Sequence, residues 1–134
     1  MNFKILDCTL RDGGFHTKWD FDNNLVDSYI ENVNKLNIDE LEIGFRFTEK
    51  DGWLGKFAYT TEETLQEFDL REDLRVGVMI FSGEFVDKGE LNKELLTKIF
   101  PLKKENSRID FVRIATYLDN LDFAILIAKH LNNL

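Results

Sequence analysis

Polar side chains that could carry chemistry gather directly after the first predicted strand. The apolar stretch over residues 3–6 predicts a short strand, and the turn after it holds Arg11 and Asp12, a further carboxylate and a hydroxyl, before Gly13-Gly14. Two glycines free the backbone from ordinary steric limits. Functional groups in α/β proteins concentrate at the carboxyl ends of strands. The segment therefore predicts a functional strand end, although a carboxylate that only caps a turn or pairs with Arg11 would give the same pattern.

A second ionisable group lies inside the next predicted strand, over residues 40–45. The two-residue period of a strand predicts that Leu41 and Ile43 face the covering helices, while Glu42 and Gly44 point inward. A glutamate in a short apolar strand is costly unless it is paired or functional. Glu42 is therefore a candidate site residue.

Two arginines are candidate partners for Glu42. Arg113 lies in a predicted strand over residues 111–116, where Val112 and Ile114 are expected to face the helices and Arg113 to face inward. An interior pair of Glu42 with Arg113 or with Arg11 would satisfy both charges without catalysis. The structural and the functional interpretations of Glu42 both stay open, and they are compatible.

These residues are positioned by strands and helices that alternate four times. The predicted strands cover residues 3–6, 40–45, 76–81 and 111–116, and the predicted helices cover residues 22–36, 60–68, 91–99 and 120–131. Asp22 or Asn23 offers an N-cap for the first helix, and Thr60 with Glu63 predicts a capping box for the second. Two long loops, over residues 15–21 and 46–59, follow the first two strands. The pattern predicts an α/β fold with a parallel (β/α)4 sheet, in a single domain over residues 1–134.

Three motifs in this chain resemble the DRE-TIM metallolyase superfamily, which includes 4-hydroxy-2-oxovalerate aldolase, HMG-CoA lyase and the isopropylmalate and homocitrate synthases. Residues 7–13, Asp-Cys-Thr-Leu-Arg-Asp-Gly, resemble the signature of its first strand, and Glu42 within residues 41–44 resembles the glutamate of its second strand. Residues 111–116 are similar to the fourth strand of the oxovalerate aldolases. A TIM barrel takes about 250 residues, so the resemblance implies the amino-terminal half of one.

The resemblance also implies an activity and roles for three residues. Members of the superfamily cleave or form a carbon–carbon bond next to a 2-oxo acid or an acyl carbonyl with the help of a divalent metal. Asp12 would be a ligand of Mg²⁺ or Mn²⁺, which prefer hard oxygen donors. Arg11 would stabilise the enolate oxygen, and Glu42 would orient Arg11 and the metal shell.

The sequence departs from that pattern at its histidines. His16 is a candidate general base, but it lies one residue beyond the position of the aldolase histidine, which is Phe15 here. Tyr117 stands where the aldolases have another histidine. The His-x-His metal ligands of the family have no counterpart, because His16 and His130 are the only histidines. We therefore expect the metal site to be absent or incomplete and the isolated chain to be inactive. The alternative is a non-catalytic half-barrel that serves as an assembly or binding module.

Composition narrows the partners and the compartment. A net charge of −8 argues against binding to nucleic acid or to an anionic membrane, since both would repel the chain. Cys8 is the only cysteine, so no internal disulfide is possible and a cytoplasmic location is favoured. The first and fourth strands would be open edges of the sheet, and such edges invite pairing. We therefore expect a homodimer. If the barrel is completed, the resemblance implies a small-molecule 2-oxo acid as the substrate.

Overall fold

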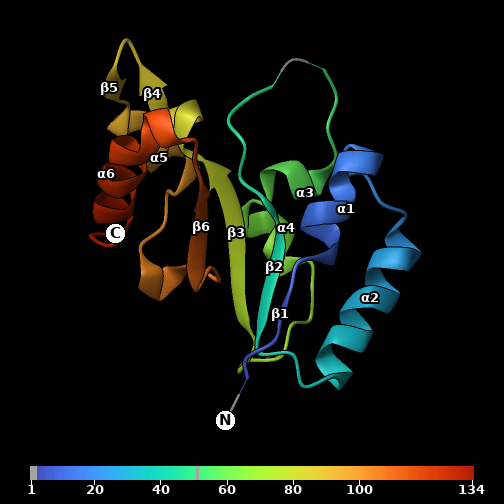
Figure 1. The fold of residues 1–134 in the computed structure, drawn as a ribbon. Helices are drawn as coiled ribbons and strands as arrows, with labels where there is room; N and C mark the ends of the chain where they lie inside the picture. The colour runs from blue at the N-terminus through green and yellow to red at the C-terminus, as the bar shows by residue number, and fades with distance from the viewer. Residues whose placement is uncertain (1–2, 51) are drawn as a thin grey trace.

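Four parallel strands form the central sheet of the computed structural model, which describes residues 3–50 and 52–134. The strand order is β1-β2-β3-β6, and every neighbouring pair is parallel. Figure 1 shows the strands side by side with their carboxyl ends at the top. The bounds of these strands are β1 Leu6–Asp7, β2 Glu40–Phe45, β3 Arg75–Phe81 and β6 Phe111–Ala115.

Helices connect the strands in the order expected for βα units. Figure 1 shows α1 and α2 beyond β1, whereas α5 and α6 lie beside β6. A small antiparallel hairpin of β4 and β5 precedes α5. The bounds are α1 Thr9–Thr17, α2 Asn23–Lys35, α3 Lys56–Tyr59, α4 Glu62–Gln66, η1 Ser82–Phe85, β4 Val86–Asp87, β5 Glu90–Leu91, α5 Lys93–Ile99, η2 Lys104–Asn106, η3 Leu118–Asn120 and α6 Leu121–Leu131.

The predicted fold class is confirmed: the chain is an α/β protein with a parallel sheet and the arrangement of a half-barrel. Strands β1 and β6 are the two edges of this sheet, as expected. The core is continuous and includes Leu41, Val78 and Ile80 from the strands, with Val26 and Ile127 from the helices. Within the described residues, no helix has the length and apolar character needed to cross a membrane.

The segment after the first strand differs from the prediction of a polar turn. Residues 9–17 form α1, so Arg11 and Asp12 lie on a helix. Gly14 serves close packing there, because a Cβ on this residue would lie 1.9 Å from the ring of Trp19. The left-handed backbone falls instead on Lys18 and Trp19, at the end of the helix. The first strand is also shorter than predicted, since only Leu6–Asp7 pairs as a strand with β2.

A register shift between Glu42 and Gly44 corrects the predicted alternation in β2. Glu42 points inward as expected, toward Arg11 and Arg113. Gly44 faces the other way: a Cβ there would meet the carbonyl oxygen of Phe57, at 2.3 Å. A bulge inserts one extra residue and changes which side chains share a face. Phe45 rather than Gly44 therefore follows Glu42 on the inner face.

Smaller corrections concern the helix ends. Asp22 caps α2, as one of the two predicted N-caps, by accepting from the amides of Asn24 and Leu25. The capping box predicted at Thr60 is wrong, because Thr61 caps α4 and Thr60 ends α3 in a left-handed conformation.

Two elements in the second half of the chain also differ from the prediction. Leu91 belongs to the hairpin rather than to the third helix, which begins at Lys93. The apolar face of α6 is only partly buried, since Leu121 and Ile125 are exposed. Asp51, in the second long loop, lies outside the described residues.

Candidate functional site

The sheet carries a buried carboxylate that is paired with a helix. Glu42 on β2 has no exposed surface, and its Oε1 accepts a hydrogen bond of 2.6 Å from Nε of Arg11 on α1. A buried carboxylate needs such a partner, because removal from water strongly disfavours an isolated charge. The predicted pairing of Glu42 with an arginine is confirmed. The pair therefore links α1, which follows the first strand, to β2.

Arg11 is held by a second carboxylate as well. Its Nη1 donates to Oδ1 of Asp12 at 2.6 Å. Burial alone would lower the pKa of Arg11, but the hydrogen bond and the charge of Glu42, together with the charge of Asp12, raise it. The guanidinium is therefore a permanent positive charge in a fixed position.

A second arginine reaches the same carboxylate from β6. Nε of Arg113 lies 3.3 Å from Oε2 of Glu42, and Nη1 of Arg113 donates to Oε1 at 3.4 Å. These contacts are longer than the charge-assisted bonds of Arg11. Oε2 is buried without a hydrogen-bond partner among residues 3–50 and 52–134. Both arginines proposed as partners thus meet at Glu42, one tightly and one loosely.

Three residues that the sequence analysis did not assign hold α1 in place. The carboxylate of Asp7 accepts from the amide of Thr9 at 2.9 Å and from the hydroxyl of Tyr29 on α2. Burial and this hydrogen bond to Asp7 raise the pKa of Tyr29. Nε1 of Trp19 donates to the carbonyl of Arg11 at 2.9 Å. Asp7 and Trp19 lie close in sequence to Arg11 and Asp12. This proximity is the feature from which the sequence could have identified them.

An aromatic wall lies beside the charged cluster. Phe45 and Phe47 stack with ring centroids 4.4 Å apart, and Phe81 from β3 stacks on Phe45 at 5.4 Å. Trp19 meets Phe45 edge to face at 5.5 Å, and the guanidinium of Arg11 lies 5.8 Å from the centroid of the same ring. Such geometry favours aromatic pairs and cation–π contacts. The cluster is therefore shielded on one side by apolar surface.

The other predicted site residues lie further out. His16 is exposed in the last turn of α1, and no hydrogen bond or ion pair among the described residues joins it to Glu42. The side chain of Asp12 is 66% exposed. Among the described residues, no three His, Cys, Asp or Glu side chains cluster so that they could hold a metal ion. The described residues therefore do not fit a complete metal site.

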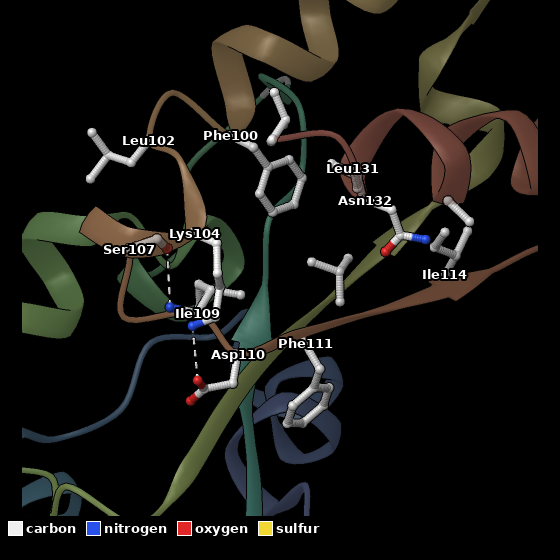
Figure 2. A pocket seen from close by; sticks show the side chains of 13 residues that line it. Phe100, Leu102, Lys104, Ser107, Ile109, Asp110, Phe111, Ile114, Leu131 and Asn132 are labelled. Carbon is white, nitrogen blue, oxygen red and sulfur yellow. Dashed lines mark hydrogen bonds and ion pairs between the residues drawn. The ribbon is translucent and has the colours of Figure 1, made fainter.

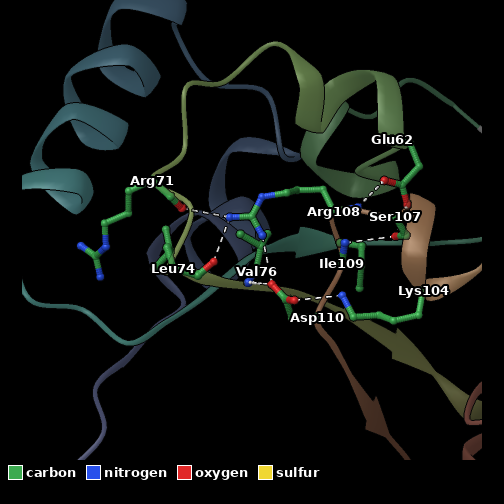
Figure 3. A network of polar contacts seen from close by, with 9 residues as sticks. All are labelled: Glu62, Arg71, Leu74, Val76, Lys104, Ser107, Arg108, Ile109 and Asp110. Carbon is green, nitrogen blue, oxygen red and sulfur yellow. Dashed lines mark hydrogen bonds and ion pairs between the residues drawn. The ribbon is translucent and has the colours of Figure 1, made fainter.

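A separate polar network ties the amino-terminal ends of β3 and β6 (Figure 3). Arg108 donates to the carbonyls of Arg71 and Leu74, while Asp110 accepts from the amide of Val76 at 2.9 Å. Burial would raise the pKa of Asp110, but that amide and the bond and charge of Lys104 lower it. This network lies at the opposite end of the sheet from Arg11.

Glu62 extends this network to Arg46. Its Oε1 accepts from Nη2 of Arg46 at 2.8 Å and from the hydroxyl of Ser107 at 2.7 Å, while its Oε2 accepts from the amide of Arg108. Burial would raise the pKa of Glu62, but these hydrogen bonds lower it. Both oxygens of each carboxylate, on Glu62 and Asp110, accept bonds from within the network, so the arrangement has a structural role.

A cavity of about 310 Å³ lies between β6, α6 and the segment before β6 (Figure 2). Its lining includes Phe100, Ile109, Val112, Ile114 and Leu131. None of Arg11, Asp12, His16 or Glu42 lines it. It is a gap on the helix-covered side of β6 and not the site predicted from the sequence.

Comparison with known proteins supports the same half-barrel. No family model and no curated protein matches this chain. One solved structure does: "the N-terminal domain of a putative aldolase from Bacteroides vulgatus", with 38% sequence identity and a TM-score of 0.76. The match covers 98% of this chain and 41% of that chain. Over almost its whole length, this protein is therefore similar in sequence and fold to a part of that longer chain.

Proposed function

We propose that residues 1–134 form the amino-terminal half of an aldolase- or lyase-type barrel of the DRE-TIM kind. Its activity would be cleavage or formation of a carbon–carbon bond next to the carbonyl of a 2-oxo acid. The similarity to the N-terminal domain of the Bacteroides chain supports the aldolase assignment. The cluster of Arg11, Glu42 and Arg113 would be the contribution of this half to the site.

The observation that carries the proposal is the fixed guanidinium of Arg11. Cleavage of the bond leaves its electron pair on the carbonyl fragment, which becomes an enolate with negative charge on oxygen. A preorganised donor stabilises such developing charge without reorganising during the reaction. The short bond to the buried Glu42 holds Arg11 in this way. Glu42 would therefore act as a positioning residue, and Arg11 as the electrostatic one.

The metal and the base need groups beyond this cluster. Asp12 would offer one carboxylate to Mg²⁺ or Mn²⁺, but the described residues do not complete such a site. His16 is proposed as a candidate base because a histidine side chain is the commonest general base in enzyme sites. Its exposed position on α1 leaves it free to face a substrate or the rest of a barrel.

The test is to join this chain to the part of the Bacteroides chain that it does not cover and to measure pyruvate release from 4-hydroxy-2-oxo acids with Mn²⁺. We expect the joined protein to cleave them and Arg11→Gln to abolish cleavage with its circular dichroism unchanged. The 134-residue chain alone should release no pyruvate. Equal rates for the joined protein and its Arg11→Gln variant would refute the assignment of Arg11.

A second candidate function, an assembly module in the cytoplasm, is favoured by the exposed apolar surface next to β6. Tyr117, Leu118, Leu121, Ile125 and Leu126 are all exposed there. Scattered apolar residues are normal on surfaces, but a contiguous patch marks an interaction site. We propose that two copies of this chain associate through this side of the sheet.

A further inference from the structure

The two arginines at Glu42 differ in how fully their charges are satisfied. Arg11 has short bonds to two carboxylates, on Glu42 and Asp12. Arg113 has only the two longer contacts to Glu42, at 3.3 and 3.4 Å. Its side chain is 45% exposed, whereas that of Arg11 is 11% exposed. Arg113 is therefore the cation with spare capacity for an anion.

Glu42 provides independent evidence that the hydrogen bonding of this site is incomplete. Its Oε2 is fully buried and lacks a hydrogen-bond partner among the described residues. An unsatisfied buried acceptor costs free energy unless a bound group corrects it. Nε of Arg113 lies 3.3 Å from this oxygen, and a ligand that holds the guanidinium in a fixed position would also complete its bond to Oε2.

The geometry of the arginine defines the ligand. None of the hydrogen bonds among the described residues uses Nη2 of Arg113, so one edge of the planar fork is free. Such an edge matches a carboxylate with two parallel hydrogen bonds. Phe81, which is partly exposed and stacks on the buried Phe45, offers apolar surface at the carboxyl end of the same sheet. A small carboxylate with an apolar portion fits both features.

We propose that Arg113 binds the carboxylate of the substrate on the inner face of the sheet, while Arg11 stays with Glu42 and Asp12. The choice of a 2-oxo acid as this substrate rests on the proposed function. The inference of a carboxylate site itself depends on the long contacts of the Arg113 guanidinium and on Oε2 of Glu42, which lacks a hydrogen-bond partner among the described residues. Arg113 would thus set the preference for acids over neutral carbonyl compounds.

The test is a nuclear magnetic resonance titration of the 134-residue chain labelled with ¹⁵N, in which the Nε–H signals of the arginines are followed. The probes are pyruvate and propionate, each raised to tens of millimolar so that even a site with a Kd of about 1 mM is saturated. We expect the Arg113 signal to shift and saturate with both. The signal of Arg75 is the matched control, since this arginine also pairs with a glutamate and is 47% exposed.

Variants distinguish a bound carboxylate from general ionic strength. Arg113→Lys keeps the charge but loses the fork, so it should weaken pyruvate binding about tenfold, whereas Arg75→Lys should leave it unchanged. No shift at Arg113, or equal shifts at Arg113 and Arg75, would overturn the proposal, and the wild-type titration decides this even if a variant does not fold. Saturable binding at Arg113 without cleavage by the joined barrel would uphold this inference and refute the proposed function.

Discussion

At the scale of single residues, the main electrostatic cost of folding is the desolvation of the buried Glu42 carboxylate. A fully buried carboxylate is shared by two arginines from different elements, and only one of them binds it at short distance. Removing one partner of a buried pair is far more damaging than removing one of an exposed pair, because the remaining charge stays desolvated.

We expect Glu42→Ala to lower the free energy of unfolding by about 3–5 kcal/mol, since it leaves Arg11 and Arg113 without their shared carboxylate. The control is Glu40→Ala, which removes the partly exposed pair with Arg75 and should cost less than about 1 kcal/mol. Urea denaturation followed by circular dichroism measures both. Equal losses for the two variants would contradict the burial and pairing of Glu42.

Glu62 predicts a dependence of stability on pH. Its pKa is lowered in the folded state, so its stabilisation is present above the unfolded value of about 4.3 and is lost as the pH falls through the folded value. Glu62→Gln should therefore flatten the fall of the denaturation midpoint below about pH 4.3. Glu31→Gln, at an exposed pair with Lys35, is the control and should follow the wild type. Parallel curves for wild type and Glu62→Gln would contradict the prediction.

At the scale of elements, the position of α1 determines where Arg11 and Asp12 lie. Its position depends on Asp7, which accepts from the amide of Thr9 and from the hydroxyl of Tyr29, and on Trp19, which packs over Gly14 and donates to the carbonyl of Arg11. Helix propensity plays no part in this, because two glycines in a nine-residue helix disfavour it. Tertiary packing therefore stabilises α1.

Two glycine substitutions test this packing. Gly14→Ala places a methyl group 1.9 Å from Trp19, and we expect a loss of about 1–3 kcal/mol from overpacking. Gly13→Ala meets only Phe21, at 3.8 Å, and should be neutral or stabilise by up to about 1 kcal/mol through helix propensity. Thermal unfolding of both variants measures the difference. A Gly14→Ala protein as stable as Gly13→Ala would mean that Trp19 does not pack on α1.

At the scale of the whole molecule, the sheet ends at β6 with an unpaired edge, and apolar side chains of η3 and α6 lie beside it. Leu118 is 89% exposed there. Burial of apolar surface gives about 25 cal/mol per Å² before the entropic cost of association. The charge of −8 opposes pairing but is screened over about 8 Å at physiological salt.

We therefore expect light scattering at micromolar concentration to give twice the 15.7 kDa mass of one chain. Leu118→Glu should shift the protein toward the single chain, because it introduces charge into the proposed interface. Leu36→Glu, at the end of α2, is an equally drastic change at another exposed leucine and should leave the mass unchanged. A mass of one chain for the wild type would refute the homodimer.

The repeating pattern of strands and helices and the pairing of the central charges could be predicted from the sequence. Apolar periodicity located the four strands and most of the helices, because the burial of one helix face or strand is a local property of spacing. Alternation along β6 and the cost of a charge inside β2 were enough to predict a pair of Glu42 with Arg11 or Arg113, and the structure brings both arginines to it. The Arg-Asp motif indicated the strand end at which these residues meet.

The orientation and exposure of the site residues, in contrast, depend on contacts between distant parts of the chain. The bulge after Glu42 placed Phe45 on the inner face and turned Gly44 toward α3, because backbone pairing with β3 sets the register there. Contacts with distant residues made a helix of a segment that local propensity predicts as a turn, and they left His16 exposed. The unequal bonds of Arg11 and Arg113 to Glu42 also follow from the sheet, since β6 holds Arg113 two strands away from β2.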